Sequence, residues 1–386
     1  MRIVLFFIVF VYLIGCGKNN TSTRMYIDQP IKSFRFDLSK DFTSYNNEGY
    51  QLIPETEILV GLNLKREEIN SYDLEKEELL ESIYYGDEKK NIYDVNNFFA
   101  ISKDSILLNS PHSNTFFLID GAGEMINRFE LDLIIPADHK YKHFTLSSTA
   151  IFNEFNIPFH YDKSKNEVSV PFQYNNLYFL DKDIAYRYPP SALISLSEKQ
   201  QIIRFIGEFP AAFQKESVPF QIEYTIDVSD SEKIINFSYS DQVFFESKND
   251  FVSIRSNFDR QNFTLFKKGI DPTTEQQMNT LNGDFMYLYT IIHPYDNSKL
   301  IRLCKHEQEI YKSDRGKLNM FLDAQWSLIT YDVNTQTVIN EYLLPRKVYD
   351  FKHLIPYKKG VLLVKSDDYK QAEDEEFLLL DYFKLF

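Results

Sequence analysis

The residues best suited to metal binding or acid–base chemistry are seven histidines, and two short segments place them near other ligand types. His139 and His143 would share one face of a helix, but no Glu follows His139 as a zinc-protease motif requires. Residues 304–307 are Cys, Lys, His and Glu; successive strand residues point to opposite faces, so we expect a solvated strand end. In residues 160–162 and 293–296 an Asp follows the His at a turn, where it is expected to accept bonds from backbone amides. The sequence therefore predicts no metal site and no cofactor.

Motifs for nucleophilic or phosphate chemistry are missing from the sequence. It contains no Gly-x-Ser-x-Gly elbow, no Walker loop and no dinucleotide-binding fingerprint. Carboxylates from distant parts of the chain can still meet, as the acid and base of a glycosidase do, and sequence spacing does not reveal such a pair. The sequence favours a protein that is not an enzyme, with a polysaccharide-active hydrolase or lyase as the alternative.

Four aspartates end an apolar run just before a polar turn: Asp73, Asp120, Asp332 and Asp381. An aspartate at such a corner bonds the amides of its own turn. These residues are therefore predicted to cap hairpins rather than to gather at a shared site.

Three other features have a functional and a plainer interpretation. The acidic residues at 367–368 and 373–376 could hold calcium, but repulsion between like charges favours a solvated loop. Cys304 lies in an apolar run and is expected to be a small buried residue rather than a reactive thiol. The lone Trp326 and the many other aromatic residues are expected to pack between strands before they serve as a platform for sugars.

The N-terminus carries the most specific chemical signal. Arg2 precedes an apolar run that ends at Gly15, which is shorter than the roughly 20 residues of a membrane-spanning helix. The run closes with Leu13-Ile14-Gly15-Cys16, which resembles the lipobox of bacterial lipoproteins. That resemblance implies a signal peptide over residues 1–15 and a diacylated Cys16, carrying chains of the palmitate class, as the new N-terminus. Two acyl chains anchor a protein stably, whereas one binds a bilayer only marginally.

The segment after the cysteine sets the expected domain layout and address. Residues 16–25 are polar without periodicity and are expected to be the lipidated cysteine and its tether, followed by a single domain over residues 26–386. With Cys16 acylated, Cys304 has no disulfide partner, so packing alone must hold the fold. By the same resemblance Gly17, which is not Asp, implies transfer to the outer membrane. The absence of an acidic stretch after the cysteine favours its periplasmic face, with surface display as the alternative.

Composition narrows the partners and the fold class. A net charge of −14 argues against nucleic-acid binding, which depends on clustered Lys and Arg. The 34 Phe and 26 Tyr residues suit pleated, half-buried surfaces and favour strands over helices. The sequence leaves the oligomeric state open.

A weak repeat of about 40–50 residues runs along the chain, which is the period of β-propellers. Its clearest copy is an apolar strand over residues 115–120, a turn containing Gly121 and Gly123, and a second strand over 125–129. Those glycines are expected to supply the positive φ of a tight hairpin. Other copies pair residues 327–332 with 337–342, 192–196 with 202–205, 243–246 with 251–254 and 68–73 with 79–83, and a last one begins at 377–381.

Strand-like runs upstream of the hairpins complete the predicted units, at residues 105–108, 167–170, 233–237, 299–303 and 361–364. The sequence therefore predicts an all-β fold, a β-propeller of six blades, with seven as the alternative count. Extra residues around 133–160 and 265–320 are expected in loops.

The last unit stops after its third strand, and the alternating residues 31–38 are predicted to supply its missing outer strand and so close the ring. Alternatives are a β-sandwich or two β domains, and a short helix over residues 73–84, where apolar residues also fall at helical spacing after Asp73.

The lipobox, the polar tether and hairpins such as 116–129 together resemble a family of Gram-negative lipoproteins of unknown function related to six- and seven-bladed propellers. The resemblance implies a fold and a location in the cell envelope, but it implies no reaction and no catalytic residues. The leading functional hypothesis is a membrane-tethered propeller whose top face or central funnel binds a protein or a glycan.

Overall fold

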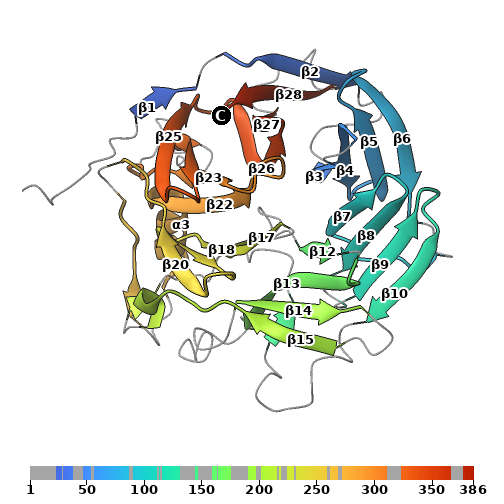
Figure 1. Ribbon diagram of the computed structural model, residues 1–386, viewed down its shortest axis with the longest axis horizontal. Coiled ribbons are helices and arrows are strands. Elements are labelled where there is room, and N and C mark those ends of the chain that lie inside the picture. The colour runs from blue at the N-terminus through green and yellow to red at the C-terminus, as the bar shows by residue number, and fades with distance from the viewer. Residues whose placement is uncertain are drawn as a thin grey trace, which may run out of the picture.

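The computed structural model describes residues 23–27, 29–37, 47–53, 56–86, 90–110, 113, 115–130, 144–146, 159–162, 164–174, 190–196, 201–214, 217–218, 224–229, 232–258, 261–267, 272–310, 323–366 and 377–386. Six antiparallel sheets stand around a common centre as the blades of a six-bladed β-propeller (Figure 1). The predicted all-β class and the count of six blades rather than seven are confirmed. No helix in the described part of the chain has the length and apolar character needed to span a bilayer.

Blades 1 to 3 follow one another in the chain, each numbered from its innermost strand outward. Blade 1 contains β3 (Asn47–Ile53), β4 (Ile58–Asn63), β5 (Glu68–Asp73) and β6 (Glu78–Tyr84). Blade 2 contains β7 (Asn97–Ser102), β8 (Ser105–Ser110), β9 (Thr115–Asp120) and β10 (Met125–Glu130). Blade 3 contains β12 (His160–Asp162), β13 (Glu167–Tyr174), β14 (Ser191–Ser195) and β15 (Gln201–Ile206), and β11 (Phe144–Leu146) also pairs with β13.

Blades 4 to 6 complete the ring. Blade 4 contains β17 (Tyr224–Val228), β18 (Lys233–Phe237), β19 (Gln242–Phe245) and β20 (Asp250–Ser253). Blade 5 contains β22 (Met286–Ile292), β23 (Lys299–Lys305), β24 (Trp326–Asp332) and β25 (Thr337–Leu344). Blade 6 contains β26 (Tyr349–Tyr357), β27 (Gly360–Lys365) and β28 (Phe377–Lys384).

Two strands near the N-terminus attach to the last two blades. As predicted, β2 (Lys32–Asp37) pairs antiparallel with β28, in register from Lys32 opposite Tyr382 to Asp37 opposite Phe377, and so supplies the fourth strand of blade 6. Blade 5 gains a fifth strand because β1 (Thr23–Tyr26) runs parallel to β25 along its outer edge. The first propeller strand that the structure describes therefore begins at Thr23.

The expected hairpins all form, and the alternative helix over residues 73–84 is wrong because this segment is a turn followed by β6. Gly123 has the expected positive φ of 75°. Gly121 does not; a β-carbon at residue 121 would instead lie 2.9 Å from Oδ1 of Asp104.

The sequence pattern does not predict the innermost strands β7, β17, β22 and β26. The runs that it predicts for the inner part of each unit are instead the second strands of their blades, which are β8, β13, β18, β23 and β27. The innermost strand β22 is buried along almost its whole length. It therefore lacks the alternation of apolar and polar residues that marks a half-exposed strand.

Among the residues that the structure describes, helical structure is confined to connections. The 3₁₀ helix η5 (Ala211–Gln214) precedes β16 (Ser217–Val218), which pairs with β21 (Phe266–Lys267). The helix α3 (Thr274–Gly283) lies in the insertion expected around 265–320, where only a loop was predicted. Thr273 and Gln276 cap its first turn reciprocally, a capping box that is readable in the sequence.

A one-residue bulge recurs in the fourth strand, counted from the axis, of four blades. The pairing skips Leu80 in β6, Ile126 in β10, Ile203 in β15 and Ile339 in β25. In each case the bulge comes shortly after the turn that enters the strand. The bulge is thus a backbone feature that repeats from blade to blade, like the sequence pattern. Aligning the blades on the bulge makes Ser82, Arg128 and Glu341 equivalent, because each is the second residue after it.

The hydrophobic core lies between blades. Phe36 of β2, for example, packs against Tyr72 of blade 1 with ring centroids 5.2 Å apart. Trp326 of blade 5 stacks on Phe351 of blade 6 at 4.4 Å, which confirms the expectation of packing between strands for this residue. Cys304 is fully buried in β23, also as expected.

The two faces of the ring differ in the length of their connections. Because neighbouring strands are antiparallel, the links between strands one and two and between strands three and four of every blade leave on the same face, which we call the turn face. None of these links in any blade is longer than residues 293–298. The long connections 131–159, 175–190, 207–223, 254–285 and 306–325 all leave from the other face, which we call the loop face.

Candidate functional site

The hairpin aspartates behave as predicted in three of four places. Oδ1 of Asp73, of Asp120 and of Asp332 each accepts bonds from two amides of its own turn, at 2.8 to 3.0 Å. Bonds from the Lys299 ammonium and from turn amides lower the pKa of Asp332 to about 2. These aspartates therefore stabilise the turn face and do not form a joint site.

Asp381 differs from that prediction because it lies inside β28 and is buried. Its carboxylate accepts bonds from Ser33 Oγ at 2.6 Å and from the Tyr349 hydroxyl at 2.7 Å, and lies 3.4 Å from the Lys365 ammonium. It fastens β2 to blade 6 rather than capping a turn.

The other predicted residues are dispersed. Asp162 and Asp296 accept bonds from the amides of Ser164 at 2.9 Å and Ser298 at 3.0 Å, as expected for turn residues. Cys16, His139 and His143, and the acidic residues at 367–368 and 373–376, lie outside the described residues. Among the residues that the structure describes, no three His, Cys, Asp or Glu side chains gather as a metal site would require.

The end of β23 corrects the expectation of a solvated strand end, because Lys305 and His306 are buried. The Lys305 ammonium donates to the main-chain oxygen of Asp284, and burial lowers the pKa of Lys305 to about 7. Burial also raises the pKa of Asp284. A strand end that the sequence placed in solvent is therefore covered by the chain around α3.

A buried arginine joins blades 4 and 5 beside this strand end. The Arg302 guanidinium is fully buried and lies 3.7 Å from the centroid of the Tyr287 ring. Its fork of donors reaches four oxygens of blade 4, which are Oδ1 of Asn236 at 3.0 Å and the main-chain oxygens of Ser240 at 2.8 Å, Asp241 at 2.8 Å and Ile254 at 2.6 Å. Burial lowers the pKa of Arg302. These bonds compensate much of the cost of removing the cation from water.

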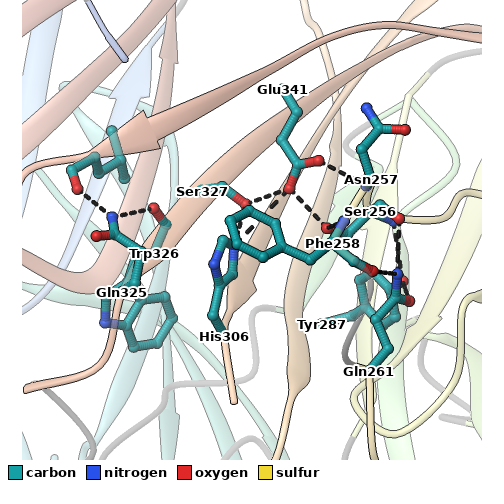
Figure 2. A network of polar contacts seen from close by, with 11 residues as sticks. Ser256, Asn257, Phe258, Gln261, Tyr287, His306, Gln325, Trp326, Ser327 and Glu341 are labelled. Carbon is teal, nitrogen blue, oxygen red and sulfur yellow. Dashed lines mark hydrogen bonds and ion pairs between the residues drawn. The ribbon is translucent and has the colours of Figure 1, made fainter. Parts of the chain in front are cut away.

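A buried carboxylate is the centre of a second group of polar contacts in the same seam (Figure 2). Glu341 of β25 accepts bonds from the Ser256 hydroxyl at 2.7 Å, the Asn257 amide at 2.7 Å and the Ser327 hydroxyl at 2.8 Å. His306 Nε2 lies 2.8 Å from Ser327 Oγ and 3.8 Å from the carboxylate. One carboxylate thus ties the chain that follows β20 to the start of β24.

The contacts of Ser327, His306 and Glu341 invite comparison with a catalytic triad, and the geometry argues against one. In a triad the carboxylate orients the ring nitrogen that faces away from the nucleophile, and the nucleophile gives its proton to the histidine. Here the Ser327 hydroxyl donates to Glu341, so it accepts from His306 Nε2. Ser327 and Glu341 are also completely buried. The arrangement can hold structure but cannot attack a substrate.

The polar groups of this seam share a position at the base of two long loop-face connections. Connection 254–285 is held at one end by Glu341 and at the other by Lys305, and the Asp284 carboxylate accepts from the Thr264 hydroxyl at 3.0 Å. Gln308 at the start of connection 306–325 donates to the Asn282 main-chain oxygen at 2.7 Å. We therefore regard the network as the scaffold that positions these connections over the loop face.

Side chains also cover the axis-facing edges of innermost strands. Gln51 of β3 bonds both the amide (2.8 Å) and the oxygen (3.2 Å) of Ala100 in β7. Asp227 of β17 accepts from the Ile292 amide of β22 at 2.6 Å, and burial raises the pKa of this half-buried carboxyl to about 7. An innermost strand has no neighbouring strand on the side that faces the axis. The Gln51 carboxamide and the Asp227 carboxyl supply hydrogen-bond partners there instead.

Sequence reasoning missed these residues, although a signal was present for two of them. Asn236 and Arg302 each interrupt the apolar interior of a second strand. A polar residue in a strand buried on both faces must find hydrogen-bond partners across a blade seam. Such a residue therefore indicates a polar contact between two blades. No comparable signal distinguishes Gln51, Asp227 or Glu341 from ordinary surface residues.

Six radial sheets closed by an N-terminal strand define the class of this protein as a six-bladed β-propeller. No family model and no curated protein matches the sequence. A solved member of the DUF4221 family from Bacteroides vulgatus is similar over 92% of this chain and 97% of its own, with a TM-score of 0.72 and 15% identity. A protein described as exported, from Bacteroides fragilis, is similar over 94% of this chain and 99% of its own, with a TM-score of 0.52 and 10% identity. At these identities the likeness shows the propeller fold alone.

Proposed function

We propose that this chain is a recognition module rather than an enzyme, tethered in the cell envelope through a lipidated Cys16 and binding a protein or glycan partner through the loop face. The observation that carries the proposal is the division between the two faces. Rigid scaffolds present binding residues on long connections, and every long connection of this ring leaves on one face. The turn face is closed by short links, several of them capped by aspartate.

The polar network supports the same proposal. Buried charged groups cost free energy unless they are fully bonded, yet this seam contains Arg302, Lys305 and Glu341. Their bonds fix the bases of two loop-face connections, which would reduce the conformational entropy lost when a partner binds. The triad-like contacts at Ser327 have the hydrogen-bond directions of a structural network rather than of a catalytic triad. The network therefore gives no support to a catalytic role.

The proposed location in the cell envelope is based on the N-terminal sequence. The short apolar run and the lipobox-like residues before Cys16 favour export and acylation, and the similar protein from Bacteroides fragilis is described as exported. Mass spectrometry of the mature protein should find two or three acyl chains on Cys16. Cys16→Ser should abolish acylation and release the protein from the membrane fraction, whereas Gly17→Asp should keep the acyl chains and change only the membrane in which it resides. An unacylated wild-type N-terminus would contradict the anchor.

Photo-crosslinking in intact cells tests the loop face with matched positions in one blade. Lys65 is exposed in the link between β4 and β5 on the loop face, and Thr56 is exposed in the link between β3 and β4 on the turn face. A photoreactive amino acid at residue 65 should give defined covalent adducts that residue 56 does not give. Equal labelling from both positions, or labelling from residue 56 alone, would reject the loop face as the recognition surface.

A further inference from the structure

The outer edge of blade 1 exposes more apolar surface than a solvent-facing strand needs. β6 ends the sheet order of blade 1, and no described strand pairs with its outer edge. Leu79, Leu80 and Tyr84 of this strand are 38%, 40% and 49% exposed. An unpaired edge of this kind presents amides and carbonyls together with side chains that favour burial.

The neighbouring blade extends this apolar edge. Met125 and Ile126 of β10 are 37% and 57% exposed. The Lys90 ammonium bonds the main-chain oxygens of Tyr84 at 3.2 Å and of Gly123 at 3.0 Å, which holds the end of β6 against the turn that enters β10. The two outer strands therefore form one surface, which we call the apolar rim and define by Leu79, Leu80, Tyr84, Met125 and Ile126.

A bulge at Leu80 does not by itself prevent strand addition. Bulges and charges are means by which proteins discourage pairing at an edge, and β6 has both. However, β25 carries the equivalent bulge at Ile339, and β1 nevertheless pairs with β25 through four consecutive residues just beyond it, Thr23 to Tyr26 opposite Asn340 to Leu343. The repeat places Glu81 to Tyr84 of β6 where β25 accepts β1. The molecule thus contains an example of the pairing that the edge of β6 leaves unused.

Charge identifies the kind of strand that fits. Glu78 and Glu81 flank the exposed leucines, and the preceding turn adds Glu75 and Glu77. Two cations lie beside these carboxylates, Lys76 in the same turn and Lys32 of β2, which pairs with Glu77 at 2.9 Å. Lys76 already contacts Asp73 at 3.2 Å and Glu78 at 3.7 Å. With a net charge of −14, a second copy of this chain would be repelled. The complementary occupant therefore combines basic and apolar residues, as β1 does with Arg24 and Met25.

We infer that β6 binds an extended basic and apolar segment of another protein, which adds a fifth strand to blade 1 in parallel, as β1 adds to blade 5. Main-chain hydrogen bonds would supply affinity, and Leu79, Leu80 and the glutamates would supply specificity. The surface lies on the rim of the ring, apart from the loop face of the proposed function.

Labelled peptides test this pairing on the full-length protein in detergent. The probe is Thr-Lys-Val-Lys-Tyr-Lys-Val; one control replaces its lysines with glutamate, and a second replaces two valines with proline to prevent strand pairing. Fluorescence anisotropy should show binding of the first peptide only. Hydrogen exchange should show new protection of amides within residues 79–84.

Matched variants locate the site. Leu79→Ser with Leu80→Ser, and separately Glu78→Lys with Glu81→Lys, should each weaken binding at least tenfold. Leu265→Ser removes an apolar side chain that is 48% exposed elsewhere and should leave binding unchanged. Equal binding of the proline peptide, or protection outside β6, would overturn the inference. Because these readouts do not involve residue 65, failure here and failure of the loop-face proposal remain separate results.

Discussion

Asp227 is the described carboxyl group in the ring whose protonation should most directly affect stability. Burial raises its folded pKa to about 7, against 3.8 for an ordinary aspartate. Between these values the folded protein binds more protons than the unfolded chain, so the free energy of unfolding falls as the pH rises from about 4 to about 7.

Asp227→Asn should remove this dependence, because an amide oxygen can still accept from the Ile292 amide without becoming charged. We expect the variant to match the wild type near pH 4 and to exceed its free energy of unfolding by roughly 1–3 kcal/mol at pH 7.5. Urea denaturation at several pH values measures the difference. Asp104→Asn, at an exposed turn, serves as the control and should show no such divergence; parallel pH profiles for Asp227→Asn and wild type would refute the argument.

Substitutions of Glu341 test whether the buried network stabilises the fold through hydrogen bonds or through the charge of the carboxylate. Glutamine keeps one acceptor for the Asn257 amide, and the Ser256 and Ser327 hydroxyls can rotate to accept from its amide group. Leucine leaves all three donors without this partner. We expect Glu341→Leu to lower the free energy of unfolding by about 2–4 kcal/mol and Glu341→Gln by about 1 kcal/mol or less. A glutamine variant as unstable as the leucine variant would show that the charge itself is required.

At the scale of elements, ring closure depends on how β2 fills the seam between blades 6 and 1. Phe36 is fully buried and meets Tyr72 of blade 1. Phe36→Ala should therefore lower the free energy of unfolding by about 3–5 kcal/mol. The exposed Asp37→Ala at the end of the same strand should change it by less than about 0.5 kcal/mol. Similar denaturation midpoints for the two variants would mean that β2 contributes little to closure.

The hairpins and the closing strand could be predicted because their physics is local. A half-exposed outer strand alternates polar and apolar residues, and an aspartate before a turn bonds its own amides, so residues 115–129 and 31–38 could be read directly. The innermost strand β22 could not, since it is buried along almost its whole length and shows no alternation. The fifth strand β1 could not be foreseen either, because three of its four residues were expected in the polar tether and acquire strand structure from the edge of β25.

The candidate site was hidden for a related reason. Glu341 occupies the repeat position of Arg128, which is partly exposed and bonds the Tyr93 hydroxyl at 3.0 Å. Blade 5 buries this position only because connection 254–285 folds over it. A contact between segments 85 residues apart, such as that of Ser256 with Glu341, leaves no periodic trace in a single sequence.

At the scale of the whole molecule, the place where the chain enters the ring should fix its orientation on a membrane. If Cys16 is acylated, six residues lie between it and Thr23 in β1, and the seven extended residue-to-residue steps span at most about 25 Å. β1 lies on the rim beside blades 5 and 6, and β10 lies across the ring from it, with β6 between them next to β2 (Figure 1). The tether therefore holds one side of the rim near the bilayer and leaves the part of the apolar rim on β10, Met125 and Ile126, directed away from it.

Fluorescent labels on the lipidated protein can measure this orientation in liposomes that contain a headgroup quencher. A label at residue 31, which is exposed next to β2, should be quenched strongly, and a label at residue 126 in β10 only weakly. Adding a flexible Gly-Ser segment of about 20 residues after Gly17 should reduce the difference, because the longer tether no longer restricts the body. Equal quenching at both positions with the native tether would show that the ring turns freely above the membrane, and the apolar rim would then have no preferred direction in which to meet a partner.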